Sequence, residues 1–332
     1  MFSYHHMNNL TSAVGVIAAS VLLSACGGGG GGPDAPASNA IKLSSAIQSE
    51  HVAEYAGAFG LLAGPGVAAI YTSIVTSIVT SFVQDVTSGA ASSDTPCSAG
   101  GSVNVVTQNT GAAGLQAGES AMLTFNQCTG EVRAPTVADD AQVNGAVSME
   151  IQTVAGPVGS ATQNWSYTAI ETASNVTLAS GNGTNTLNGT VTYTQSYDAN
   201  SGVTTTTAIA PSVTIGRTQT TSTGNVSGAI TVTSLAFSRI HGANPVTDML
   251  ATSGAVSVSA SDAVIAFNVA TSTPVLTGQG DLQAGLLQIS DADTVETLTP
   301  RDSSTINITV ATGGNSATYT ESLANFTSIA GG

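Results

Sequence analysis

Over most of the chain, apolar and polar side chains alternate one for one in segment after segment. Val147, Met149 and Ile151, for example, are separated by Ser148 and Glu150. The same alternation recurs at 191–194, 230–233, 265–269 and 305–310. A period of two puts successive side chains on opposite faces of a strand, so each segment can turn one face to a core and the other to water. We therefore predict a mainly β fold for residues 97–332, a long antiparallel meander that forms a curved sheet or half-barrel.

A small polar residue followed by glycine recurs just before several of these segments. The pairs are Asn144-Gly145, Asn188-Gly189, Ser227-Gly228 and Ser253-Gly254. Their spacings of 44, 39 and 26 residues are uneven, which excludes a solenoid of fixed repeat length. We interpret the pairs as turns that lead into strands.

The stretch before the predicted sheet has a helical period instead. Between residues 44 and 63, large side chains recur at spacings of four, four, four and three: Ile47, His51, Tyr55, Phe59 and Leu62. These spacings place them on one face of a helix that packs on the sheet, with His51 as a packing histidine.

A second helix is predicted over residues 67–86, after the break at Gly64-Pro65-Gly66. Ile70, Ile74, Ile78 and Phe82 are four residues apart. Serine and threonine side chains occupy the opposite face, which favours an amphipathic helix lying on the sheet. A length of about twenty residues leaves a transmembrane helix as the alternative.

The amino terminus has the pattern of an export signal. Leu10 to Ala25 contains no charged residue and is too short for a permanent membrane span. Leu23-Ser24-Ala25-Cys26 resembles the lipobox of bacterial lipoproteins, in which the cysteine becomes the lipidated first residue. The resemblance implies that residues 1–25 are a signal peptide and that Cys26 carries the membrane anchor.

The residues after Cys26 have the composition of a flexible tether. Gly27–Gly32 is a run of six glycines, followed by a segment rich in proline and alanine. In Gram-negative lipoproteins, aspartate after the lipidated cysteine is associated with retention at the inner membrane; Gly27 therefore implies the outer membrane. The expected organisation is a signal peptide (1–25), a tether (26–43), a helical segment (44–96) and an antiparallel β domain (97–332).

The charge of the chain excludes one class of partner. Its formal net charge is −15, and only five residues are lysine or arginine. The five are scattered singly along the sequence: Lys42, Arg133, Arg217, Arg239 and Arg301. Nucleic-acid binding needs a basic surface, which this chain lacks.

Two cysteines remain besides the lipobox cysteine. Cys97 and Cys128 are most simply a disulfide in an oxidising compartment of the cell envelope. A metal-binding pair and a reactive thiol are the alternatives, but the sequence has no Cys-x-x-Cys and no cluster of histidines.

Three segments taken together resemble an uncharacterised group of proteobacterial outer-membrane lipoproteins. They are "PCSAGGSVNV", "GLQAGESAMLTFNQC" and, near the end, "GGNSATYTESLANF". Members of that group follow a lipobox and glycine tether with a helical stretch, cysteine-bracketed strands and repeated glycine-led strands. The group has no assigned activity, so the resemblance implies an architecture and a location only.

No catalytic or metal-binding constellation stands out in the sequence. His241 is expected in a loop, where it could act as a hydrolase base, but no Gly-x-Ser-x-Gly motif follows the lipobox. Asp139-Asp140 and the pair Asp291 and Asp293 supply too few ligands for a Ca²⁺ site. We predict no cofactor, no metal and no enzymatic activity.

Three functions from different classes remain. The first is a binding or structural module of the outer membrane. The second is a carrier of an apolar ligand or lipid in a half-barrel cavity, by analogy at the level of fold. The third is a cell-surface hydrolase. The first two differ in whether the inward-facing side chains fill a core or line a cavity.

Overall fold

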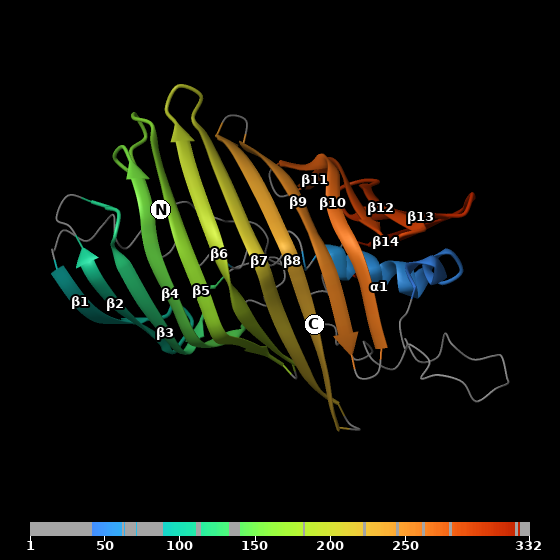
Figure 1. Ribbon diagram of the computed structural model, residues 1–332, viewed down its shortest axis with the longest axis horizontal. Helices are drawn as coiled ribbons and strands as arrows, with labels where there is room; N and C mark the ends of the chain where they lie inside the picture. The colour runs from blue at the N-terminus through green and yellow to red at the C-terminus, as the bar shows by residue number, and fades with distance from the viewer. Residues whose placement is uncertain are drawn as a thin grey trace.

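In the computed structural model the chain forms one open antiparallel sheet of fourteen strands, each paired with its neighbours in sequence from β1 to β14 (Figure 1). The structure describes residues 42–61, 63, 71, 89–110, 114–132, 140–181, 183–221, 224–243, 246–260, 263–278, 281–322 and 325. The strands are β1 (Gly89–Pro96), β2 (Ser102–Thr110), β3 (Ser120–Thr129), β4 (Gln142–Ala155), β5 (Trp165–Ser180), β6 (Gly183–Asp198), β7 (Val203–Thr221), β8 (Gly224–Ala243), β9 (Val246–Ala260), β10 (Ala263–Gly278), β11 (Asp281–Ser290), β12 (Thr294–Pro300), β13 (Thr305–Thr312) and β14 (Asn315–Ser322). The predicted mainly β meander is confirmed.

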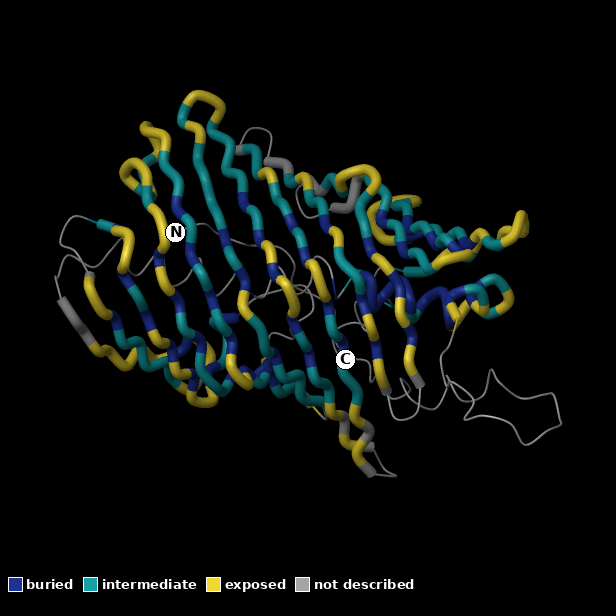
Figure 2. The backbone as a smooth tube through the Cα atoms, in the orientation of Figure 1, coloured by how far each residue is buried: buried dark blue, intermediate teal, exposed yellow. Residues whose placement is uncertain are grey.

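The alternation seen in the sequence separates the two faces of the sheet. On β13, Ile306, Ile308 and Val310 are buried, while Asn307 and Thr309 between them are partly exposed. Buried and more exposed segments alternate along most strands in the same way (Figure 2). We call the face that carries the buried side chains the inner face and the opposite face the outer face. The buried side chains of the inner face belong to one hydrophobic core.

Two short helical elements cover the inner face near the C-terminal strands. They are η2 (Leu43–Ile47), a 3-10 helix, and α1 (Glu50–Leu61), and both lie against strands between β10 and β14 (Figure 1). A Cβ atom on Gly60 would lie 2.8 Å from Cδ1 of Ile289, so the absence of a side chain lets α1 approach β11 closely. The Tyr319 hydroxyl of β14 lies within 3.1 Å of the carbonyl oxygens of Ala46 and Ile47 and ties the end of η2 to the sheet.

The predicted apolar face of the first helix is right for Phe59, which is buried in the core, and wrong for His51. His51 lies on the solvent side of α1, with a side chain 71% exposed. The buried residues of α1 include Val52, Ala53, Ala56 and Ala58. Alanine and glycine let the helix lie close to the sheet, so the buried face follows the small side chains and the larger side chains at 51 and 55 are left at its margin.

The boundary between helical and β segments is also earlier than predicted. β1 begins at Gly89, inside the segment expected to be helical, and pairs with β2. Its sequence, GAASSDTP, has almost no apolar alternation. An edge strand with little core contact leaves no periodic pattern from which it can be recognised.

The glycine-led pairs lie inside strands and do not form turns, which corrects the prediction from sequence. The glycines fall within β4, β6, β8 and β9: Gly145, Gly189, Gly228 and Gly254. The strand register shifts beside three of them, in the pairings β4–β5, β6–β7 and β8–β9. These shifts are β-bulges, which bend a strand and increase its twist. The bulges of neighbouring strands lie at adjacent points and form a row across the sheet. The sheet curves along this row.

The residue before the glycine has a role in this row of bulges. The side-chain oxygen of Asn188 accepts a hydrogen bond of 2.7 Å from the backbone N–H of Asn175, which has a φ of 52°. The side-chain oxygen of Asn144 accepts a bond of 2.8 Å from the N–H of Gln127, which has a φ of 49°. Each asparagine therefore satisfies an N–H that the bulge on the preceding strand removes from the ladder.

Several predictions fall outside the described residues. They are the signal peptide, the tether up to residue 41, and the helix over 67–86 except for Tyr71. Within the part of the chain that the structure describes, no helix combines the length and hydropathy needed to cross a membrane.

Candidate functional site

The three cysteines have different outcomes. Cys26 lies outside the described residues, so its lipidation stays a prediction. Cys97 and Cys128 form a disulfide with Cα atoms 5.5 Å apart, as predicted. The bond joins the residue that follows β1 to β3, at the β1 edge of the sheet. The strands that α1 contacts, β11 to β13, lie near the other end of the strand order.

His241 lies on a strand, not in the loop expected from sequence. It is near the end of β8 and pairs across the ladder with Asp248 of β9. Its Nδ1 atom is 2.9 Å from Oδ1 of Asp248. The guanidinium of Arg239 donates two bonds to the same carboxylate, from Nε at 2.8 Å and from Nη2 at 3.1 Å. Strand pairing thus brings together three ionisable groups that lie seven and nine residues apart in the sequence.

The protonation of this group follows from its contacts. Burial alone would raise the pKa of the Asp248 carboxyl, but the hydrogen bonds and positive charge of Arg239, with a smaller contribution from His241, lower it below the usual value. Asp248 is therefore ionised at neutral pH and can only accept hydrogen bonds. It follows that Nδ1 of His241 carries the hydrogen of this bond, so that Nε2 is the ring nitrogen that Asp248 does not engage.

The row that contains His241 continues along the same end of the sheet. Trp165 faces Tyr197, Tyr197 faces Thr204, and Thr204 faces His241. One row deeper, Gln195 and Arg239 also lie on the inner face, on β6 and β8. All of them are partly exposed. We call this set the upper rim, because it follows the upper edge of β5 to β9 in Figure 1: Trp165, Gln195, Tyr197, Thr204, Arg239, His241 and Asp248.

The aromatic rings of the upper rim pack against each other. The ring centroids of Trp165 and Tyr197 are 5.8 Å apart with an interplanar angle of 22°, and Trp165 also stacks on Tyr167 at 6.2 Å. Nε1 of Trp165 donates to the carbonyl of Ser160 at 2.9 Å, and the Tyr197 hydroxyl donates to the carbonyl of Ala161 at 3.1 Å. These bonds hold the β4–β5 loop against the rim.

Hydrogen bonds lead from the rim into the core. The hydroxyl of Tyr167 donates to Oε1 of Gln195 at 3.2 Å, and Nε2 of Gln195 donates to the hydroxyl of Thr206 at 3.3 Å. Thr206 is the cross-strand neighbour of Arg239. A hydrogen-bonded row therefore leads from the buried Tyr167 to Thr206, beside Arg239 of the charged group.

Two glutamates lie on the inner face where apolar side chains are expected. Glu171 of β5 and Glu296 of β12 are both 0% exposed. Within the described structure neither carboxyl has a hydrogen-bond partner. Burial raises the pKa of both carboxyls well above the usual value, so burial favours the protonated, neutral form of each.

Tyr71 lies against the centre of the sheet, close to Glu171. Its side chain is 0% exposed, and its hydroxyl donates to the carbonyl of Gly189 on β6 at 2.9 Å. Burial, with a smaller effect of Glu171, raises the pKa of the Tyr71 hydroxyl. Glu171 and Tyr71 are therefore both part of the packed core, where burial favours the neutral form of each.

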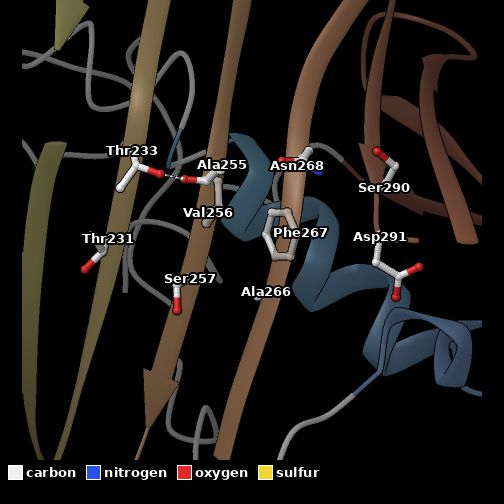
Figure 3. Close-up of a pocket in the computed structure, with 10 residues that line it drawn as sticks. All are labelled: Thr231, Thr233, Ala255, Val256, Ser257, Ala266, Phe267, Asn268, Ser290 and Asp291. Atoms are coloured by element: carbon white, nitrogen blue, oxygen red, sulfur yellow. Dashed lines mark hydrogen bonds between the residues drawn. The ribbon is translucent and has the colours of Figure 1, made fainter. Parts of the chain in front are cut away.

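The outer face has a shallow groove of about 310 Å³ over β8 to β11. It is lined by Thr231, Thr233, Ala255, Val256, Ser257, Ala266, Phe267, Asn268, Ser290 and Asp291 (Figure 3). Asp291 is the ionisable residue of this lining, and Oδ1 of its carboxylate already accepts bonds from the backbone N–H groups of Asp293 and Thr294. The groove therefore offers mainly hydroxyl and amide groups, with one carboxylate whose Oδ1 is already hydrogen-bonded to the backbone.

The acidic pairs predicted to be poor metal sites have local structural roles. Asp291 closes the turn before β12, and the carboxylate of Asp140 accepts a bond of 2.9 Å from the Ser180 hydroxyl. Asp139 lies outside the described residues. In the described ranges, no three histidine, cysteine or acidic side chains gather into a group that could hold a metal ion.

Sequence reasoning missed the upper rim and the two buried glutamates. The alternation of apolar and polar residues could have revealed the glutamates. Glu171 occupies the same face of its strand as Tyr167 and Ala173, and Glu296 occupies the same face as Leu298. No local signal joins Trp165 to His241, because their placement in one row depends on the pairing of four strands, β5 to β8. The chain matches no protein-family model, no curated protein and no solved structure.

Proposed function

We propose that the protein is a binding or structural module of the bacterial outer membrane, anchored through lipidated Cys26 and held off the membrane by the tether that precedes Leu43, the buried first residue of η2. The observation that carries the proposal is the packing of the inner face. Its large side chains, from Leu123 on β3 to Ile308 on β13, are buried in one core. A folded domain with a filled interior presents its surfaces to partners and does not enclose a ligand.

The packing extends over both halves of the inner face. Near the C-terminal strands, α1 lies close enough for Gly60 to contact Ile289 and Val269. Near the middle, Tyr71 is buried against Gly189. An apolar ligand would have to displace these contacts, which counts against the carrier function.

A hydrolase needs a nucleophile beside its base. His241 and Asp248 have the geometry of a base and its orienting acid. Among the described residues, however, no serine, threonine or cysteine donates a hydrogen bond to His241. The pair therefore supports a binding role better than a catalytic one.

The anchor is tested by the partition of the protein between detergent and aqueous phases. The Cys26→Ser variant lacks the thiol to be lipidated and is expected in the aqueous phase, whereas the wild-type protein is expected in the detergent phase. The matched control is the double variant Cys97→Ser/Cys128→Ser, which keeps Cys26 and should partition like the wild type. Equal partition of the wild type and Cys26→Ser would refute the proposed anchor.

A further inference from the structure

We infer that the upper rim is a binding site for a neutral carbohydrate chain. The inference rests on the proposed function, because it names the partner of a binding module.

The rim concentrates residue types that are rare in this chain. Only 8% of the residues are charged, and the chain has one tryptophan, four histidines and five lysines or arginines. That tryptophan, Trp165, lies on the same row as His241 and Asp248, and Arg239 lies one row deeper. The rest of the sheet gains its solubility from threonine, serine and asparagine. A structural rim in such a chain needs none of these side chains.

The hydrogen-bonding groups of the rim suit hydroxyl groups. Nε2 of His241 is not engaged by Asp248 and can bond to a hydroxyl group in either form of the ring, as an acceptor when the ring is neutral and as a donor when it is protonated. The Thr204 hydroxyl beside it both donates and accepts. A sugar hydroxyl can donate to one of these groups and accept from the other at the same time.

The shape of the rim suits an extended ligand. The row runs across five strands, from Trp165 on β5 to Asp248 on β9. Four inter-strand steps of about 4.8 Å give a length of about 19 Å. The stacked rings of Trp165 and Tyr197 lie at one end and the charged group at the other. Partly exposed aromatic side chains can pack against the C–H face of a sugar ring while their polar atoms stay hydrogen-bonded.

The charge of the rim selects neutral chains. Arg239 and Asp248 offset each other in a bidentate pair. The formal net charge of the whole chain is −15, which repels polyanions such as nucleic acids and acidic polysaccharides. The rim therefore offers hydrogen bonds and ring surface without a net charge to bind an ion.

The test uses saturation-transfer NMR on the full mature chain in detergent micelles, with two neutral hexasaccharides as probes, one of glucose and one of N-acetylglucosamine. We expect the wild-type protein to bind at least one of the two hexasaccharides and to transfer saturation to it. In His241→Ala and in the isosteric Thr204→Val, the affinity is expected to fall about tenfold. Matched controls are His51→Ala, on the solvent side of α1, and Thr172→Val, on the outer face of β5; both should bind like the wild type.

Each outcome decides the inference. The inference is overturned if the folded wild type transfers saturation to neither hexasaccharide. It is also overturned if both rim variants bind with the affinity of the wild type. If His241→Ala fails to fold, Thr204→Val carries the test, because valine matches the shape of threonine. A protein that partitions into detergent through Cys26 but binds neither sugar would leave the proposed anchored module intact and exclude only the carbohydrate.

Discussion

The buried glutamates give the most specific prediction, which concerns the pH dependence of stability. Glu171 is fully buried, and its carboxyl has no hydrogen-bond partner within the described structure. Burial raises the pKa of this carboxyl well above the usual value, so it stays protonated in the folded state when it is already ionised in the unfolded chain. The groups nearest to it electrostatically, Tyr71 and Tyr167, are themselves neutral and supply no compensating charge.

The sign of the effect follows from proton linkage. A raised folded-state pKa means that the contribution of Glu171 to stability is fully present below the unfolded pKa and is lost as the pH rises through the folded-state pKa. Within that window, each pH unit costs about 1.4 kcal/mol of unfolding free energy for one such group. Glu171→Gln removes the ionisable group with little change of shape. The variant should therefore lose this part of the slope and become more stable than the wild type as the pH rises.

The assay is urea unfolding at pH 5, 6 and 7, on a Cys26→Ser background that needs no detergent. The unfolding free energy of the wild type should fall more steeply with pH than that of Glu171→Gln, by up to about 1.4 kcal/mol per pH unit. Histidine titration cancels in this comparison, because both proteins carry the same histidines. The matched control is Glu150→Gln on β4, where the side chain is exposed, and its slope should equal that of the wild type. Parallel slopes for the wild type and Glu171→Gln would refute the burial of an unpaired carboxyl.

Two further predictions concern the sheet itself. Removing the disulfide with Cys97→Ser/Cys128→Ser should lower the unfolding free energy by about 3–4 kcal/mol in the chain-entropy model, as measured by urea unfolding; an unchanged value would contradict the covalent link. Gly189→Ala should cost about 1–3 kcal/mol, because the residue has a φ of 142° and a Cβ atom would lie 2.9 Å from the carbonyl oxygen of Ser212. Gly183→Ala, which meets nothing closer than 3.7 Å, serves as its control, and equal melting temperatures for the two variants would show that the bulge at Gly189 does not require glycine.

The sequence predicted those parts of the fold that are encoded locally. Alternation along single segments, as at Ile306, Ile308 and Val310, depends only on the strand period and on burial of one face. The disulfide followed from the number of cysteines and the expected compartment. Both predictions held because neither depends on which strand pairs with which.

The features that were missed depend on long-range packing. The Asn-Gly pairs look like turns, because the residues suited to a turn are also suited to a bulge, where glycine takes a positive φ and asparagine accepts a backbone N–H. The exposure of His51 depends on which face of α1 can approach the sheet, and that is set by alanine and glycine at neighbouring positions. The upper rim exists only because β5 to β9 are paired in register.

The central claim, that the sheet has a filled interior and not a ligand cavity, is tested most directly by native mass spectrometry of the mature lipoprotein released from membranes in mild detergent. The account predicts a single species whose mass is that of the chain from Cys26 onward plus its covalent acyl groups. A second species heavier by a non-covalently bound lipid, lost on harsher activation and still seen with Cys26→Ser, would contradict it and favour a carrier.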